Sequence, residues 1–245
     1  MQAQYIIGRN SILEAFEEET NFEKIYISKQ AHGDAVKKII QKAKEKDVYV
    51  QYVPEIKLDY LANKQPHQGV VAAIQLIAYY NFQEIVDFCY NEGRTPLFIV
   101  LDGITDVRNF GAIARTALGL DADLIIIPKK ESVSITADAI KTSAGALLKI
   151  PVAKVDNLHT TIKDLKNNGI KIVGLEGAAT QTFQEADLKV PMALVLGAED
   201  KGISTPVLKL LDEKLKLPMN EELESYNVSV ANALALYEVY RQRNH

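Results

Sequence analysis

Leu217-Pro-Met-Asn-Glu-Glu-Leu-Glu-Ser-Tyr-Asn-Val-Ser-Val-Ala231 separates the last short apolar run of this 245-residue chain from a closing segment with helical spacing. Ser225, Asn227 and Ser229 alternate with larger side chains within it. A core rarely needs such a run, because burying a polar group costs free energy unless it is hydrogen-bonded. We therefore expect this stretch to carry chemistry rather than packing.

Upstream of this stretch, beyond Pro96, short apolar runs alternate with segments of helical spacing. This alternation predicts an α/β fold with a parallel sheet covered by helices on both faces. The expected strands are Leu97–Leu101, Leu124–Ile127, Ile170–Leu175, Ala193–Leu196 and Leu215–Leu217. The expected helices are Ala112–Leu118, Thr136–Leu148, Leu158–Asn167 and Thr205–Leu211.

The polar segments after three of these strands are expected to meet. An open parallel sheet binds its ligand beyond the carboxyl ends of its strands. That rule gathers Asp102–Asn109, Gly197–Gly202 and Pro218–Asn227 around one crevice.

The N-terminal third has the pattern of a second, smaller α/β domain. We expect domains at residues 1–77 and 96–245, joined by a linker at 78–95 that contains at least one helical turn. The elements predicted in the first domain are a helix at Ile12–Phe16 with Asn10 and Ser11 as its cap, a strand at Phe22–Ser28 with alternating apolar and polar residues, a helix at Asp34–Lys46 and a strand at Val48–Val53. The segment Gly69–Leu76 completes the domain.

Composition narrows the class of protein. The chain is 47% hydrophobic and 24% charged, and it has no apolar run of the roughly 20 residues that span a bilayer. No targeting segment is evident, so we expect a cytoplasmic protein without membrane contact. The single cysteine, Cys89, has apolar neighbours and is interpreted as a buried thiol. Four scattered histidines lack metal-ligand spacing, so no metal site is expected.

The net charge of −4 argues against a protein that simply coats nucleic acid. Five lysines nevertheless gather on one predicted helix: Lys37, Lys38, Lys42, Lys44 and Lys46. They could contact RNA, or they could form only a solvated face.

Two glycine-flanked segments bear candidate site residues. Gly103 and Gly111 flank a loop with Asn109, and Arg115 follows on the next predicted helix. A helix start with an Arg nearby suits phosphate binding, although this Arg could equally pair with a carboxylate on the surface. The turn Leu196-Gly-Ala-Glu-Asp-Lys-Gly202 lets backbone approach a ligand, but a lone glycine-rich turn is weak evidence.

Leu101–Ala117, Ala193–Ile203 and Leu217–Ala231 together resemble, in order and spacing, the three motifs of the SpoU family of RNA ribose 2'-O-methyltransferases. The resemblance implies a knotted (trefoil) parallel-sheet catalytic domain and S-adenosylmethionine as cofactor. It also implies direct methyl transfer to a ribose hydroxyl.

The family motifs carry over residue by residue. Asn109, Gly111 and Arg115 match the substrate motif, in which the Arg is the proposed catalytic residue. The active-site residues implied by the resemblance are Arg115, Asn109, Glu199, Ser225 and Asn227. Because an Arg stays protonated, we expect Arg115 to act electrostatically, with phosphate or solvent taking the proton.

Cofactor binding in this family relies largely on loop backbone. The resemblance points to Gly197, Leu217 and Tyr226, with Met219 as an apolar neighbour. The chain departs from the family pattern where Asp200 and Glu221 replace glycines and Tyr226 replaces a leucine. Asn227 could also simply cap the last helix.

The segments Gly8–Ala15 and His67–Ala72 resemble the substrate-binding domain of bacterial 23S rRNA guanosine 2'-O-methyltransferases, a domain similar to small RNA-binding ribosomal proteins. Lys141–Ala146 resembles a family element near the cofactor crevice, although ordinary packing of small residues explains its side chains. The family pairs through its catalytic domain. The last helix carries apolar positions at helical spacing that are consistent with a homodimer, although such a stripe could equally pack into the core: Val230, Ala233, Leu234 and Tyr237, with Val239 and Tyr240 nearby.

The leading hypothesis is 2'-O-methylation of a guanosine in 23S rRNA. The alternatives are a tRNA ribose as the acceptor, or a noncatalytic RNA-binding or ribosome-assembly protein of the same fold. Calorimetry with S-adenosylmethionine separates the last from the others, because a noncatalytic protein need not bind the cofactor.

Overall fold

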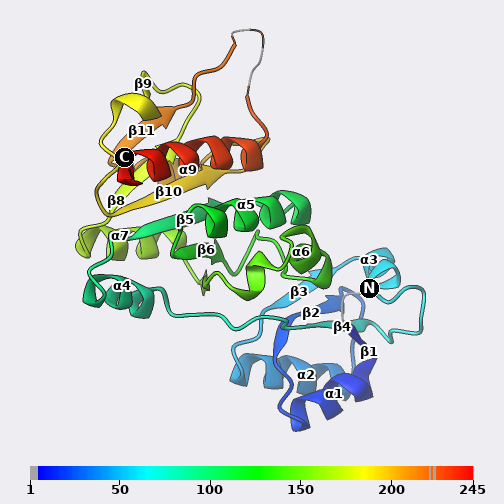
Figure 1. Ribbon diagram of the computed structural model, residues 1–245. Coiled ribbons are helices and arrows are strands. Elements are labelled where there is room, and N and C mark those ends of the chain that lie inside the picture. The colour runs from blue at the N-terminus through cyan, green and yellow to red at the C-terminus, as the bar shows by residue number, and fades with distance from the viewer. Residues whose placement is uncertain (1–4, 221, 223–224, 245) are drawn as a thin grey trace. The chain divides into compact units, whose positions relative to one another are not determined.

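The computed structural model describes residues 5–220, 222 and 225–244, and its elements are labelled in Figure 1. The chain divides into two units. The smaller contains the described residues up to Ile77 together with Ser134–Asp138, and the larger contains Ala78–Val133 and the described residues from Ala139 onward.

The smaller unit is built on a four-stranded sheet in the order β1-β4-β2-β3. Strand β4 pairs antiparallel with β1 and β2, whereas β2 and β3 are parallel. Its elements are β1 (Tyr5–Ile7), α1 (Arg9–Glu17), β2 (Phe22–Ser28), α2 (Asp34–Glu45), β3 (Val50–Val53), α3 (Glu55–Leu61) and β4 (Val70–Ile74).

Helices cover both faces of this sheet. Residues of α1 and α2 pack in one cluster with Ile25 and Ile27, while α3 packs in a second cluster with Tyr26. Consequently β2 is buried along its whole length instead of alternating between core and solvent. The predicted strand Phe22–Ser28 is confirmed. Its alternation of apolar and polar residues did not indicate that every residue of the strand is buried.

The first helix begins at Arg9, three residues before the predicted run from Ile12, and follows Gly8, whose φ of 93° favours glycine. Asn10 and Ser11 therefore lie inside the helix and do not cap it. Strand β1 and helix α3 were not predicted. Both are too short, at three and seven residues, to show a period in sequence.

The larger unit contains a seven-stranded sheet in the order β7-β6-β5-β10-β8-β11-β9. All its pairs are parallel, as predicted. The elements are α4 (Phe82–Asn91), β5 (Leu97–Asp102), α5 (Val107–Gly119), β6 (Leu124–Pro128), α6 (Ala137–Thr142), η1 (Ala146–Leu148), β7 (Val152–Val155), α7 (Leu158–Asn167), β8 (Lys171–Leu175), β9 (Gln181–Thr182), η2 (Phe183–Glu185), β10 (Met192–Gly197), α8 (Thr205–Leu208), β11 (Glu213–Lys216) and α9 (Val228–Asn244).

Helices lie on both faces of this sheet as well. Residues of α4, α7 and α8 share one apolar cluster with every second residue of β5, β6 and β10. Because side chains alternate across a strand, the intervening residues face the other side, where α5 and α9 lie next to each other (Figure 1). This layering confirms the predicted α/β class.

Helix α4 lies within the segment predicted as a linker. Its Val86 and Cys89 are fully buried in the core of the larger unit. Burial raises the pKa of the Cys89 thiol to about 11, which agrees with its interpretation as a buried thiol.

The helix predicted at Thr136–Leu148 is interrupted. Helix α6 ends at Thr142, and Ala144 and Gly145 adopt left-handed conformations with φ of 51° and 82° before η1. A Cβ added to Gly111 of α5 would lie 2.7 Å from the Thr142 Cβ, so this region packs closely against α5. The small residues of Lys141–Ala146 thus have the packing role expected of them.

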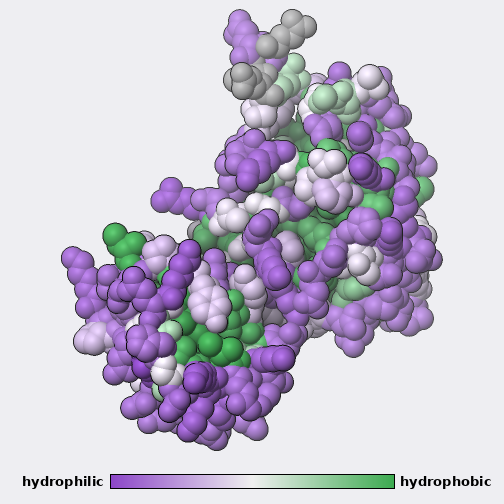
Figure 2. Space-filling view, turned by 180° about the vertical axis from the view of Figure 1, so that it is seen from behind, coloured by the Kyte–Doolittle hydropathy of each residue, from purple (hydrophilic) through white to green (hydrophobic). Residues whose placement is uncertain are grey.

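No helix among the described residues is long and apolar enough to cross a membrane. The face drawn in Figure 2 is mostly hydrophilic, with smaller hydrophobic patches.

Candidate active site

The glycine turn after β10 has a tightly closed backbone. Ala198 and Gly202 exchange two hydrogen bonds, with the Ala198 N–H donating over 3.1 Å and the Gly202 N–H over 2.8 Å. A Cβ on Gly197 would lie 2.0 Å from the Gly202 carbonyl carbon. Gly197 is therefore required by close approach of backbone, and Gly202 by its φ of 65°.

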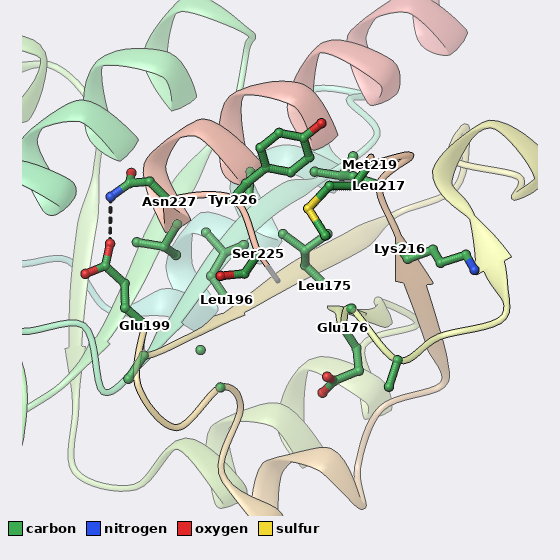
Figure 3. Close-up of a pocket in the computed structure, with 17 residues that line it drawn as sticks. Leu175, Glu176, Leu196, Glu199, Lys216, Leu217, Met219, Ser225, Tyr226 and Asn227 are labelled. Atoms are coloured by element: carbon green, nitrogen blue, oxygen red, sulfur yellow. Dashed lines mark hydrogen bonds between the residues drawn. The ribbon is translucent and has the colours of Figure 1, made fainter. Parts of the chain in front are cut away.

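A polar cluster joins the three sequence motifs. The Asn227 amide donates to Glu199 Oε1 over 2.6 Å, the dashed contact of Figure 3, and to Asn109 Oδ1 over 3.1 Å. The Asn109 amide donates to the same Glu199 oxygen over 2.9 Å. Residues up to 118 positions apart in sequence are thus held together by their side chains.

Each member of this cluster is positioned by a separate element. Asp106 caps α5 by accepting from the Arg108 and Asn109 N–H groups, both at 2.8 Å, and so fixes the helix start that carries Asn109. At the start of α9, Asn227 Oδ1 accepts from the N–H and hydroxyl of Ser229. Asn227 therefore has both roles considered from sequence, as a cap and as a member of the site.

A cavity of about 480 Å³ opens beside this cluster at the carboxyl ends of β8, β10 and β11. Figure 3 shows side chains from these strand ends and from the segment before α9 around it. Its lining contains Leu175, Glu176, Gly177, Ala178, Leu196, Gly197, Ala198, Glu199, Gly202, Lys216, Leu217, Met219, Ser225, Tyr226, Asn227, Val228 and Ala231.

The cavity brings together most of the residues selected from sequence. Four assigned to the cofactor line it, as do three assigned to catalysis: Gly197, Leu217, Met219 and Tyr226, and Glu199, Ser225 and Asn227. Asn109 joins them through Glu199. Glu221 lies outside the described residues, and Asp200 is exposed in the glycine turn.

Tyr226 closes the rim of the cavity. Its hydroxyl donates to the Pro218 carbonyl over 3.0 Å, a contact that a leucine could not make. The departure from the family pattern at this position thus adds a hydrogen bond between the two ends of the segment that follows β11.

Arg115 is not part of the cavity lining. It is exposed on α5 and has no hydrogen bond or ion pair to the residues that the structure describes. It follows Asn109 by six positions on the same helix, so at about 100° per residue the two side chains leave the helix in different directions. The surface pairing with a carboxylate considered from sequence is absent among the described residues.

Sequence reasoning missed Glu176, Gly177 and Lys216, which also line the cavity. The strands that precede Glu176 and contain Lys216 were predicted, and the rule that ligands bind at the carboxyl ends of strands applied to β8 as well. These residues belong to none of the three motifs. Only their position at a strand end could have identified them from the sequence as cavity-lining residues.

Family models match both parts of the chain. The model for the SpoU rRNA Methylase family matches residues 96–237. The chain belongs to this family. A second model, RNA 2'-O ribose methyltransferase substrate binding, matches residues 5–80.

Relatives of this SpoU-family chain cover its full length. YacO of Bacillus subtilis, assigned to the TrmH family of tRNA/rRNA methyltransferases, is 37% identical over 99% of this chain and 97% of its own length. A relative from Staphylococcus epidermidis with the same family assignment is 38% identical over 100% of this chain and 98% of its own length.

Solved structures share the fold. The SpoU methyltransferase AviRb of Streptomyces viridochromogenes, in complex with AdoMet, is similar over 98% of this chain and 90% of its own, at a TM-score of 0.62 and 20% identity. A TrmH/SpoU tRNA modifying enzyme of A. aeolicus covers 61% of this chain and 76% of its own, at a TM-score of 0.55 and 30% identity.

This SpoU-family chain is an S-adenosylmethionine-dependent RNA methyltransferase. Its cavity suits the cofactor, since sites for molecules of that size are concave and mostly apolar with a few polar groups at the edge. Leu175, Leu196 and Met219 supply apolar lining, and Glu199 and Asn227 supply polar groups. No group of three or more His, Cys, Asp or Glu side chains placed to hold a metal occurs within the described part of the chain.

Proposed function

We propose that this methyltransferase modifies the 2'-hydroxyl of a ribose in structured RNA, specifically a guanosine of 23S rRNA. The observation that carries the proposal is the Asn109–Glu199–Asn227 cluster at the rim of the cavity. It places fixed polar groups next to an apolar cavity, as transfer from a bound donor to an oriented hydroxyl requires. The match of residues 5–80 to the substrate-binding model supports a ribose acceptor.

The cofactor supplies a methyl group on a positively charged sulfur. We assign Gly197, Leu217 and Tyr226 to holding it, largely through backbone, with Met219 beside them. The close backbone packing at Gly197 and the Tyr226 hydroxyl bond to Pro218 support this assignment, because they fix the two loops before any ligand arrives.

The acceptor side is assigned to Asn109, Glu199, Ser225, Asn227 and Arg115. Glu199 receives both amide bonds on Oε1, so Oε2 retains acceptor capacity for a hydroxyl of the ribose. The two amides keep this carboxylate in place. Arg115 carries a positive charge that stabilises the oxyanion as the 2'-hydroxyl loses its proton to phosphate or solvent.

A tRNA ribose is the second candidate acceptor, because the relatives from B. subtilis and S. epidermidis are assigned to a family of tRNA and rRNA methyltransferases. We propose that the enzyme is located in the cytoplasm, where both rRNA and tRNA are found. Mapping of 2'-O-methyl groups across total rRNA and tRNA in a deletion strain decides between them. Loss of one methyl group from a 23S guanosine is expected, whereas loss from a tRNA alone would select the second candidate.

We propose that residues 1–77 form a separate RNA-binding domain. Its independent sheet and apolar clusters support this role. Removing residues 1–77 should leave a folded catalytic domain that still binds the cofactor but has lost most of its RNA affinity. Calorimetry with S-adenosylmethionine and filter binding of rRNA measure the two properties. RNA affinity equal to that of the full chain would contradict the assignment.

We also propose that the enzyme is a homodimer joined through α9 and the neighbouring α5. Three apolar side chains spaced as one helix face remain exposed on α9, at 46% for Val230, 42% for Leu234 and 59% for Tyr237. Pairing would bury them and bring Arg115 of α5 to the partner's cavity. This placement accounts for an active-site Arg that lies outside its own cavity.

Replacing Leu234 with Asp should separate the dimer, because pairing would bury an unpaired charge. Light scattering should report twice the chain mass of 27.2 kDa for the wild type and the single mass for the variant, with activity lost alongside. Phe88→Asp on α4 changes another exposed apolar side chain and should leave the dimer intact. A fully active wild-type monomer would refute the pairing.

A further inference from the structure

The smaller unit has a cavity of its own, of about 500 Å³ and with a largely polar lining. It lies between α3, the turn after β2 and the loop before β4. Its lining residues are Arg9, Ser28, Gln30, Ala31, Glu55, Asp59, Lys64, Gln65, Pro66, His67, Gln68 and Gly69. We call it the His67 pocket.

His67 holds the wall of this pocket in a defined conformation. Its side chain is 8% exposed, and Nδ1 accepts from the Gly69 N–H over 3.0 Å. Nε2 therefore carries the ring proton and donates to Asp59 Oδ1 over 3.1 Å. The loop includes left-handed residues at Lys64 and Gln68, with φ of 61° and 52°. Such conformations persist only where their surroundings fix them, and they cluster at binding sites.

Hydrogen-bonding groups remain available around the pocket. Arg9 donates from Nε to the Gln68 carbonyl over 2.8 Å and from its backbone N–H to Gln68 Oε1 over 3.1 Å. Its two terminal guanidinium nitrogens and the Glu55 carboxylate have no hydrogen bond or ion pair to any residue the structure describes. Fixed donors and an unused acceptor thus line one cavity.

The balance of charge indicates the ligand. Arg9 and Lys64 face the pocket together with Glu55 and Asp59, so two cations are offset by two carboxylates. Such a lining disfavours a phosphate. A guanine base fits, because its N1–H and N2–H groups donate to a carboxylate while its O6 and N7 accept from an Arg or Lys.

A neighbouring surface suits the next base. Tyr60 and Ile56 on α3 are 84% and 77% exposed, one position beyond Asp59 and Glu55 respectively. Helix α3 thus carries polar groups for a base edge and, on the adjoining strip, apolar groups for a base face. Proteins that recognise RNA sequence use this combination: unpaired bases stack on aromatic rings, and polar groups hydrogen-bond to the base edges.

We propose that the His67 pocket binds an unpaired guanine base of the RNA substrate, with Glu55 accepting from its Watson–Crick edge and Arg9 donating to its acceptors. The proposal rests on the proposed function for the existence of an RNA substrate, and it assigns part of the recognition to a base distinct from the reacting ribose.

The test is a titration of the full-length protein with GMP, followed through the histidine ring signals by NMR. A His67→Asn variant assigns the His67 signal. AMP and UMP carry the same ribose and phosphate and serve as controls. The His67 signal should shift saturably with GMP, at an affinity roughly fivefold or more above that for AMP. No shift, or equal shifts with all three nucleotides, would overturn the proposal.

Variants locate the preference. Glu55→Gln should bring GMP affinity down to that of AMP, while Glu18→Gln, an exposed change just after α1 and outside the pocket, should retain the preference. Retained preference in Glu55→Gln would contradict the assigned edge. The GMP titration does not measure methyl transfer, so the two ideas can fail separately. If the protein methylates RNA but shows no GMP response, only this inference is refuted. If it responds to GMP but methylates no RNA, only the proposed function is refuted.

Discussion

Arg115→Ala should lower methyl transfer by about 100-fold while leaving S-adenosylmethionine affinity almost unchanged, because one well-placed charge at a developing oxyanion contributes on the order of 3 kcal/mol. The Arg115 side chain is exposed, makes no hydrogen bond or ion pair to the described residues, and is absent from the cavity lining. Its removal should therefore leave the fold and the cofactor affinity unchanged. Single-turnover assays with saturating RNA, together with calorimetry, separate the two effects.

Two further variants sharpen this test. Arg115→Lys keeps the charge but loses the planar fork, and it should also be impaired. Lys163→Ala removes an exposed charge on α7, on the opposite face of the sheet, and should behave as wild type. Wild-type turnover by Arg115→Ala would remove this residue from the mechanism.

Gly197→Ala should weaken cofactor binding and the fold around the glycine turn. The added Cβ would lie 2.0 Å from the Gly202 carbonyl carbon and 2.1 Å from the Ile203 nitrogen, and neither backbone atom can rotate away as a side chain could. The turn must move, at a cost of about 1–3 kcal/mol in unfolding free energy. Calorimetry should show S-adenosylmethionine affinity reduced by at least about 10-fold, since roughly 1.4 kcal/mol of lost binding energy corresponds to that factor.

The matched control is Gly119→Ala at the end of α5, where an added Cβ meets no atom within 4 Å. It should retain both stability and cofactor affinity. If Gly197→Ala binds the cofactor as tightly as this control does, the closed turn is not part of the cofactor site.

The sheet of the larger unit was predictable because its strands are short, apolar and separated by helices, a pattern that few other folds produce. The exceptions have physical reasons. Val152–Val155 includes Lys154 and is four residues long, so its composition does not distinguish it from a loop. Helix α5 starts five residues before the prediction because the Asp106 side chain caps it, whereas the prediction followed only the apolar spacing from Ala112 onward.

The candidate site was predictable to the extent that it follows strand ends and motifs. Glu199, Asn227 and Asn109 were selected from sequence, but their shared hydrogen bonds depend on distances that only the folded chain sets. Glu176 and Lys216 carry no motif, and they enter the cavity only because β8 and β11 are neighbours in the sheet. The position of Arg115 outside the cavity also required the structure.

The most direct test of the central claim is mass spectrometry of nucleosides from rRNA and tRNA, each incubated with the enzyme and S-adenosylmethionine carrying a deuterated methyl group. A 2'-O-methyl nucleoside bearing the label on its ribose, reduced by about 100-fold when Arg115→Ala replaces the wild type, is the expected result. A label found on a base, or no label in rRNA or tRNA, would contradict ribose methylation by this chain.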